Sequence, residues 1–251
     1  MLTEQRFEAI LELLEEKNSV TVKELTELLD ASESTIRRDL TVLNKAGKLV
    51  KVFGGAVALD TRYNTTDPEI EERLTLHNEE KRLVAEYAAG MIKPDDIVFL
   101  DAGTTTGCMI EYLENNGAKF VTNGITHAKE LSHAGFRVVL IGGELKRSTE
   151  ATVGAEAMSQ LAKFNFTLGF FGTNGVSKKA GFTTPDMNEA TVKNVAMSRC
   201  RKKIVLCDYS KFGQISSVTF GNISDAVIVT DQVPDEYENF GNIIGLNKIS
   251  K

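Results

Sequence analysis

The chain has 251 residues, of which 42% are hydrophobic and 25% charged, a composition typical of globular proteins rather than disordered or fibrous ones. This length can hold one large domain, or a small domain and a medium one that each bury a core. The formal net charge is −6, which excludes a chain that is basic throughout, and no apolar run approaches the roughly 20 residues of a membrane span. We therefore expect a cytoplasmic protein that does not bind membranes.

Two helices are predicted at the start of the chain. The first runs from Thr3 to Lys17, because apolar residues recur near a 3.6-residue period and glutamates lie between them. Its apolar positions include Leu2, Phe7, Ile10, Leu11 and Leu14. The second helix begins at Thr21-Val22-Lys23-Glu24, which has the spacing of a capping box, and the leucines that follow form its buried stripe.

A third helix is predicted to follow after a turn of only three residues. Ser32 is a good N-cap, and Ile36, Leu40 and Leu43 share one helical face at i, i+4 and i+7. Two short helices joined by so tight a turn predict a helix-turn-helix, whose second helix enters the major groove of DNA. Taken alone, the adjacent Arg37 and Arg38 could instead mark a helix face that is exposed only to solvent. The residues assigned to DNA here are Ser32, Ser34, Thr35, Arg37, Arg38, Thr41 and Lys45.

A basic β-hairpin is predicted behind this helix. Gly47 is a candidate C-cap, and the run from Lys48 to Ala58 has two short apolar stretches separated by Gly54-Gly55, which suits a two-residue turn with positive φ. Between Ser34 and Lys51 five cations stand against one carboxylate, Asp39, so a cationic edge exists despite the acidic total. Such a hairpin completes a winged helix. The wing residues assigned to DNA are Lys48, Lys51, Gly54 and Gly55.

The sequence predicts a winged helix-turn-helix domain over residues 1–58, a linker over 59–78 and a larger domain over 79–251. The stretch from Asp60 to Pro68 loses periodicity and is rich in turn formers, whereas a helix is expected from Glu79 to Ile92. From Asp96 onward short apolar runs alternate with helical stretches, which predicts an α/β domain with a mainly parallel sheet covered on both faces. The expected strands are 97–100, 120–122, 137–141, 166–171, 204–206 and 226–229, and the expected helices are 106–114, 126–133, 155–163 and 187–201.

Several of these strands end in glycine or small polar residues, and ligands of open α/β sheets bind at the carboxyl ends of strands. Gly103 is followed by Thr104, Thr105 and Thr106 at the start of a helix. Close backbone approach combined with hydroxyl donors suits a phosphate. The spacings of a P-loop and of a dinucleotide-binding turn are absent, so a nucleotide is not expected. A threonine-capped turn without a ligand is the alternative.

The histidines and cysteines of the sequence form no metal-ligand pattern. We expect His77, His127 and His133 at the surface or in a satisfied core. Buried reduced thiols are expected for Cys108, Cys200 and Cys207. Neither a metal nor a cofactor is expected.

The run TVKELTELLDASESTIRRDLTVLNKAGKLVKVFGGA resembles the winged-helix signature of the DeoR family of bacterial transcriptional regulators, and the likeness extends over the whole chain. One departure lies in the wing, where Lys51 and Phe53 replace the arginine and histidine common in the family. A lysine still meets a phosphate as a point charge, but the bidentate geometry of arginine is lost. The runs DAGTTT, FVTNGITHAKELS, FFGTNGVSKKAGFTTPD and DYSKFGQISSVTF are similar to the fructose-operon repressors within the family.

This resemblance implies that the larger domain has the ribose-5-phosphate isomerase fold and binds a phosphorylated sugar, and the narrower likeness implies fructose 1-phosphate or the 1,6-bisphosphate. The turn from Gly103 to Thr106 would hold the phosphate. Lys193 and Lys211 are candidate cations for the phosphate or a sugar oxygen, with surface salt bridges as the alternative. The positions that would line the sugar are Asp101, Asn123, Gly142, Gly143 and Asn174.

Two functions are compatible with these features. The first is a repressor that leaves operator DNA when a sugar phosphate accumulates. One winged helix reads too few base pairs for genomic specificity, so we expect a homo-oligomer, a dimer or tetramer, on repeated or palindromic half-sites. The alternative is a sugar-phosphate isomerase with a DNA-binding appendage, in which Asp101, Asp186, Glu189 or Asp208 would be the general base. No feature of the sequence indicates that two of these carboxylates act as a catalytic pair, so we do not expect an enzyme.

Overall fold

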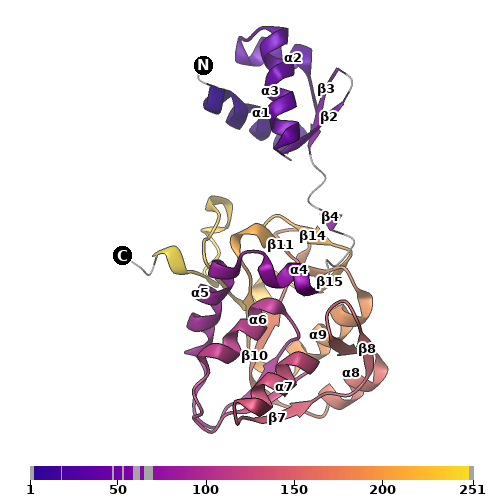
Figure 1. Cartoon of the computed structure of the whole chain (residues 1–251), viewed down its shortest axis with the longest axis vertical. Coiled ribbons are helices and arrows are strands. Elements are labelled where there is room, and N and C mark those ends of the chain that lie inside the picture. Colours follow the sequence, from indigo (N-terminus) through magenta and orange to yellow (C-terminus); the bar gives the residue numbers. More distant parts are fainter. Residues whose placement is uncertain are drawn as a thin grey trace. The chain divides into compact units, whose positions relative to one another are not determined.

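The computed structural model describes residues 3–17, 19–46, 48–52, 54–58, 63–64 and 70–248. The chain divides into two compact units, Met1–Arg62 and Tyr63–Lys251 (Figure 1). Leu2, Gly47, Phe53 and residues 59–62 and 65–69 of the predicted linker lie outside the described residues. The described part of that linker contains β4 (Tyr63–Asn64) and α4 (Ile70–Thr75), both of which belong to the larger unit. Of the helices in the described ranges, none combines the length and apolarity needed to cross a membrane.

The smaller unit is a winged helix-turn-helix. The capping box predicted at Thr21 and Glu24 is present, and Ser32 caps the third helix by accepting a hydrogen bond from the N–H of Thr35 at 3.3 Å. Apolar side chains of all three helices, among them Ile10, Leu25 and Ile36, meet in one fully buried core. Its elements are α1 (Thr3–Lys17), β1 (Ser19–Thr21), α2 (Val22–Leu29), α3 (Glu33–Lys45), β2 (Leu49–Val52) and β3 (Gly55–Ala58).

The turn of the wing differs from the prediction. Val52 pairs with Gly55, so the two residues between the strands are 53 and 54 rather than Gly54-Gly55. Gly54 has the positive φ of a turn residue, +83°, whereas Gly55 lies in β3 opposite Thr21 of β1. A Cβ added at Gly55 would lie 2.1 Å from the carbonyl oxygen of Val20. Gly55 is therefore required by the close approach of a third strand, which the local sequence pattern does not reveal.

The larger unit is built on a seven-stranded sheet in which every strand pairing is parallel. This confirms the predicted α/β class with a mainly parallel sheet. In the order β17-β16-β13-β10-β5-β6-β7, the central β10 lies between β13 and β5. The last strand in sequence, β17, was not predicted. The bounds are β5 (Ile97–Leu100), β6 (Lys119–Thr122), β7 (Arg137–Leu140), β10 (Phe166–Gly172), β13 (Cys200–Leu206), β16 (Val227–Thr230) and β17 (Ile243–Gly245).

Helices cover both faces of this sheet (Figure 1). Alternate residues of β5 enter two apolar clusters: Val98 and Leu100 pack with α5 (Asn78–Ala89) and α7 (Ile125–His133), and Phe99 packs with α8 (Ala155–Leu161) and α9 (Met187–Ser198). Four predicted helices end early. The largest difference is at α6 (Thr104–Cys108), which is followed by a 3-10 helix (Met109–Tyr112). Helices α5, α8 and α9 end at Ala89, Leu161 and Ser198 rather than at 92, 163 and 201, and residues 200–201 belong to β13.

Short strands absent from the prediction lie beside the main sheet. They are two to four residues long, too short to establish a period of two. β8 and β9 form a hairpin, β11, β12 and β15 form an antiparallel sheet, and β14 pairs with β4. Their bounds are β8 (Glu144–Lys146), β9 (Ala151–Val153), β11 (Gly175–Ser177), β12 (Gly181–Thr184), β14 (Ile215–Ser216) and β15 (Val218–Gly221).

The three cysteines are free thiols, of which Cys200 and Cys207 are buried as expected and Cys108 is partly exposed. Burial raises the pKa of the Cys200 thiol to about 12, so this thiol stays protonated and unreactive near neutrality. Over the part of the chain that the structure describes, no three His, Cys, Asp or Glu side chains are grouped to hold a metal ion.

Candidate DNA-binding surface and effector pocket

Helix α3 has one buried and one exposed side, as its periodicity predicts. Ile36 and Leu40 are fully buried, Leu43 is 4% exposed, and the side chains of Arg37 and Arg38 are exposed. Of the other residues assigned to DNA, Ser32, Ser34, Lys45, Lys48, Lys51 and Gly54 are exposed, Thr35 and Thr41 are partly exposed, and Gly55 is buried.

Asp39 does not share the exposed side of α3 with these cations. Arg6 of α1 binds both of its carboxylate oxygens, from Nε at 2.5 Å and from Nη2 at 3.1 Å, and the hydrogen bonding raises the pKa of Arg6. Asp39 is 4% exposed, so its negative charge does not reduce the positive charge of the exposed side of α3. A count of charges along the sequence had included it there. Glu33 is the acid beside them, with its carboxylate 3.3 Å from Nη2 of Arg37 in an exposed pair.

The wing is attached to the recognition helix by polar contacts. The backbone N–H of Lys51 donates to Oδ1 of Asn44 at 2.8 Å. The Lys51 ammonium lies 2.6 Å from Oγ1 of Thr41 and 3.4 Å from the carbonyl oxygen of Arg37. Lys51 therefore places its charge directly on the exposed side of α3, where it forms one cationic surface with the arginines.

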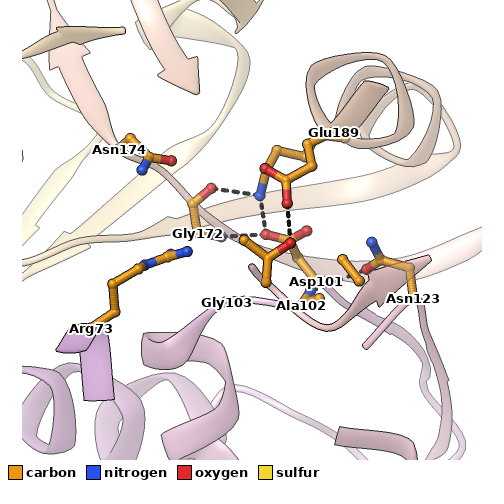
Figure 2. A pocket seen from close by; sticks show the side chains of 11 residues that line it. Arg73, Asp101, Ala102, Gly103, Asn123, Gly172, Asn174 and Glu189 are labelled. Carbon is orange, nitrogen blue, oxygen red and sulfur yellow. Dashed lines mark hydrogen bonds and ion pairs between the residues drawn. The ribbon is translucent and has the colours of Figure 1, made fainter. Parts of the chain in front are cut away.

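In the larger unit, a small cavity opens at the carboxyl ends of the central strands. Figure 2 shows Asp101, Gly172 and Glu189 converging on it, with Arg73 reaching toward the same space from the other side. Five of the residues predicted to bind the effector line it: Asp101, Gly103, Asn123, Asn174 and Lys193. The remaining lining residues are Arg73, Ala102, Thr149, Ala151, Gly172 and Glu189.

Two of the charges inside this cavity, those of Lys193 and Asp101, are paired with each other. The Lys193 ammonium contacts the Asp101 carboxylate and donates to the carbonyl oxygen of Gly172 at 3.1 Å. Asp101 also accepts a hydrogen bond from the N–H of Gly172 at 3.0 Å, which joins the ends of β5 and β10. Lys193 thus sits in the site, 8% exposed, and not in a surface salt bridge.

Glu189 provides a second carboxylate on the same cavity. It accepts from Oγ1 of Thr149 at 2.5 Å and lies 3.3 Å from the ammonium of Lys146. Carboxylates such as those of Asp101 and Glu189 accept hydrogen bonds from sugar hydroxyls. The neighbouring side-chain amides of Asn123 and Asn174 can both donate and accept. The cavity is chemically suited to a polyol.

A larger cavity adjoins the first, and both are lined by Arg73, Gly103, Gly172 and Asn174. The predicted phosphate residues Thr104 and Thr105 and the candidate cation Lys211 line the larger one. It is completed by Thr173, by Leu76 and His77 between α4 and α5, and by Lys81 of α5.

Thr106 and His127 hold the turn between β5 and α6 from inside. Oγ1 of Thr106 donates to the carbonyl oxygen of Asp101 at 2.6 Å and accepts from the N–H of Gly103 at 3.0 Å, and Thr106 is fully buried. Nε2 of His127 lies 3.0 Å from the carbonyl oxygen of Gly103, and burial lowers the pKa of this imidazole. Both side chains fix the turn, and His127 is one of the satisfied core histidines expected from the sequence.

The structure does not bring Gly142 and Gly143 into either cavity. They follow the edge strand β7, two strands away from β5. The N–H of Gly142 donates to Oε1 of Gln160, and a Cβ at Gly143 would lie 2.5 Å from the carbonyl oxygen of Val153. The close approach of β9 accounts for Gly143, whereas Gly142 lies against Gln160 of α8.

Several lining residues were not assigned to the effector from the sequence, among them Arg73, His77, Lys81 and Thr149. The first two fall in the segment predicted as a linker, where the irregular pattern indicated no contact with the larger domain. Lys81 lies on a correctly predicted helix, on which a lysine ordinarily marks the solvated side. Lys81 is only 5% exposed because of how the larger unit folds around it, and the spacing of residues along the helix does not predict this burial.

Comparisons with known proteins agree with this two-part architecture. Residues 6–62 match the model of the DeoR-like helix-turn-helix domain, and residues 76–232 match that of the DeoR C terminal sensor domain. Solved structures that resemble part of the chain include ribose 5-phosphate isomerase A from Methanocaldococcus jannaschii, with 15% identity, a TM-score of 0.41 and coverage of 54% of each chain.

Similar proteins over nearly the full length are named as regulators. An uncharacterized HTH-type transcriptional regulator FruR of Bacillus subtilis (strain 168) is 39% identical over 96% of both chains. The lactose phosphotransferase system repressor of Staphylococcus aureus (strain NCTC 8325 / PS 47) is 33% identical over 92% of this chain and 93% of its own. The chain, which joins a winged helix with an exposed cationic face to a sensor domain, belongs to the DeoR family of DNA-binding transcriptional regulators.

Proposed function

We propose that the chain is a repressor of a sugar-catabolic operon and that a phosphorylated sugar releases it from operator DNA. The observation that carries the proposal is the pairing of an exposed cationic recognition helix with a polar cavity at the strand ends of the second unit. Similarity to a lactose phosphotransferase system repressor supports the same class of target.

On the DNA side, Arg37 and Arg38 contact phosphates or a guanine edge in the major groove, because they leave α3 on its exposed side. Ser34, Thr35 and Thr41 fix the register of the helix. Lys51 extends the same surface into the wing, where lysines add affinity that does not depend on sequence.

On the effector side, fructose 1-phosphate is the proposed ligand, with fructose 1,6-bisphosphate as the nearest competitor. The support is the likeness of four strand-end runs to fructose-operon repressors and the 39% identity to FruR of Bacillus subtilis. Binding of the sugar and of the operator weaken each other by the same factor, since the two equilibria are linked. A homo-oligomer on repeated half-sites supplies the length of DNA that one winged helix cannot read.

The test is operator binding to the DNA upstream of the gene cluster that encodes the protein, measured by footprinting. The footprint is repeated with fructose 1-phosphate, fructose 1,6-bisphosphate, fructose 6-phosphate, glycerol 3-phosphate and a deoxyribose phosphate. We expect a protected site that one of these compounds abolishes. Protection that none of them changes would overturn the effector assignment, and no protection at all would overturn the repressor.

A further inference from the structure

One edge of the seven-stranded sheet is open to another strand. β7 comes last in the strand order and, among the described residues, pairs only with β6 (Figure 1). We infer that β7 is an interface with a second copy of this chain, whose own β7 pairs with it in antiparallel fashion about a two-fold axis. The inference rests on the proposed function and deepens it, because it assigns the contact of the homo-oligomer proposed there.

β7 presents apolar side chains to solvent. Val139 is 48% exposed and Leu140 is 42% exposed. Val121, the residue beside Val139 on β6, is only 2% exposed. The apolar layer of the sheet therefore extends to a last strand whose side chains are only half covered, and the side chains of one more strand would cover them.

The opposite edge of the sheet is short and largely covered. β17 has three residues and continues directly into a 3-10 helix (Leu246–Lys248), and both of its isoleucines are partly buried. Short edge strands, charged side chains and bulges are the features with which proteins prevent pairing at an edge. β7 instead has four residues in regular register with β6, and its one charged residue, Arg137, is at its first position. β7 thus has the features of an edge that accepts a strand.

The backbone of β7 indicates that the occupant is a strand. The N–H of Ile141 donates to the carbonyl oxygen of Thr122 in β6 at 2.8 Å. Because backbone groups alternate in direction along a parallel strand, those of 137, 139 and 141 point toward β6. The N–H and C=O groups of Val138 and Leu140 consequently point away from the sheet, at the spacing at which another strand would pair with them.

A second β7 matches this edge in a specific register. A two-fold axis perpendicular to the sheet joins each face to the same face of the second copy, so residues directly opposite differ by an even number of positions. An axis through Val139 sets Val139 opposite Val139 of the second copy. Val138 then lies opposite Leu140, and their outward backbone groups exchange both hydrogen bonds. The strand is therefore complementary to itself.

The charge of Arg137 favours this register over the next one. With the axis through Val139, the two Arg137 residues lie four positions apart along the strands, roughly 13 Å, which is beyond the screening length at physiological salt. An axis through Val138 would halve this separation and would leave the exposed Val139 opposite Arg137. The self-match of the apolar residues and the separation of the cations are the reasons for choosing a second copy as the occupant.

The experiment measures the molar mass of the full-length protein by sedimentation velocity, in the wild type and in Val139→Lys, Val139→Glu and Val50→Lys. Because Val139 lies opposite itself, with Cα atoms about 4.5 Å apart, each Val139 variant sets two like charges against each other. The Kd for self-association should rise about 100-fold or more, so that both variants have half the mass of the wild type. Val50 is the matched control, a valine of β2 that is 42% exposed, and Val50→Lys should keep the mass of the wild type.

Mixing the two variants tests the register. An equimolar mixture of Val139→Lys and Val139→Glu should return to the mass of the wild type, because opposite charges then face each other across the axis. Misfolded variants would not be rescued in this way, and a thermal melt of each variant confirms folding. Val139→Cys should also form a disulfide between two chains on mild oxidation, since the expected Cα separation suits a disulfide.

The contrary outcomes separate the inference from the function on which it rests. Val139→Lys and Val139→Glu with the mass of the wild type would overturn the β7 interface and leave the proposed homo-oligomer standing, and a mixture that stays at half the mass would overturn the register. A wild type with the mass of one chain would overturn both the interface and the homo-oligomer. Absence of operator protection by the wild type overturns the repressor itself, and that result does not depend on β7.

Discussion

Helix α3 and the proposed effector pocket use charged side chains in opposite ways. On α3 the arginines are exposed and the apolar residues are buried, so the helix presents charge to a partner without any cost of burial. At the pocket, Asp101, Lys81 and Lys193 are each at most 8% exposed, and each depends on partners inside the fold. A surface of the first kind is built from local sequence, whereas a site of the second kind requires segments far apart in the chain to meet.

The largest effect is expected where a buried charge pair supports the exposed helix. Replacing Arg6 with Ala leaves the Asp39 carboxylate buried without its bidentate partner, which should destabilise the smaller unit by about 3 kcal/mol. Hydrogen exchange of the α1 and α3 amides in the full-length protein measures this loss. As a control, Glu33→Ala removes an exposed pair with Arg37 and should change protection by less than about 0.5 kcal/mol. Equal protection in the two variants would show that Asp39 does not need Arg6.

A smaller effect, on DNA and not on stability, is expected for the exposed arginines. Arg37→Ala or Arg38→Ala should weaken operator binding by about 1–3 kcal/mol if the residue reads a guanine, or reduce the salt slope by about one if it meets a phosphate. Fluorescence anisotropy over a range of salt concentrations distinguishes the two. Unchanged affinity and slope in the double variant would remove α3 from the interface.

Loss of the neutral hydroxyl donors of the pocket should change the binding free energy of the effector by an amount similar to or smaller than the effect of the arginines on DNA binding. Thr104→Ala combined with Thr105→Ala removes two hydroxyl donors from the larger cavity, each worth about 0.5–1.5 kcal/mol. The concentration of fructose 1-phosphate needed to release the operator should rise about 10-fold, with affinity for the operator in the absence of sugar as the internal reference. Release at the original concentration would place the phosphate elsewhere.

The smallest effect is expected in the wing. Lys51→Ala removes the contact with Oγ1 of Thr41 and one exposed charge, so both specific and nonspecific DNA binding should weaken by about 1 kcal/mol or less. Competition with unrelated DNA measures the two affinities together. A loss confined to the specific operator would mean that Lys51 reads a base.

The same contrast explains which features the sequence could predict. The three helices of the smaller unit, its capping box and its buried stripe follow from periodicity and from side chains three or four residues apart, so they were predicted closely. The turn of the wing was predicted wrongly. The glycine at position 55 is required because the carbonyl oxygen of Val20, on a strand far away in the sequence, lies close to it, and the residues next to Gly55 do not indicate this contact. The alternation of strands and helices likewise predicted the parallel sheet, because buried strands of such sheets form continuous apolar runs.

The pocket was only partly predictable. Asp101, Gly103 and Asn174 were found because they end strands, and strand ends meet at one edge of a parallel sheet. Gly142 and Gly143 also end a strand, but β7 is at the edge of the sheet and its carboxyl end lies away from β5 and β10. Strand order could not be derived from the pattern, and neither could the return of α4 and α5 over the strand ends, which adds Arg73 and Lys81.

In the proposed function, one chain binds operator DNA through α3 and leaves it when a sugar phosphate occupies the second unit. The most direct measurement is the anisotropy of labelled operator DNA titrated with fructose 1-phosphate, in parallel for the wild type, Arg37→Ala with Arg38→Ala, and Thr104→Ala with Thr105→Ala. We predict release of the wild type, weak initial binding of the arginine pair variant, and binding of the threonine pair variant that persists to about 10-fold higher sugar phosphate. Operator binding by the wild type that no phosphorylated sugar reverses would contradict the account.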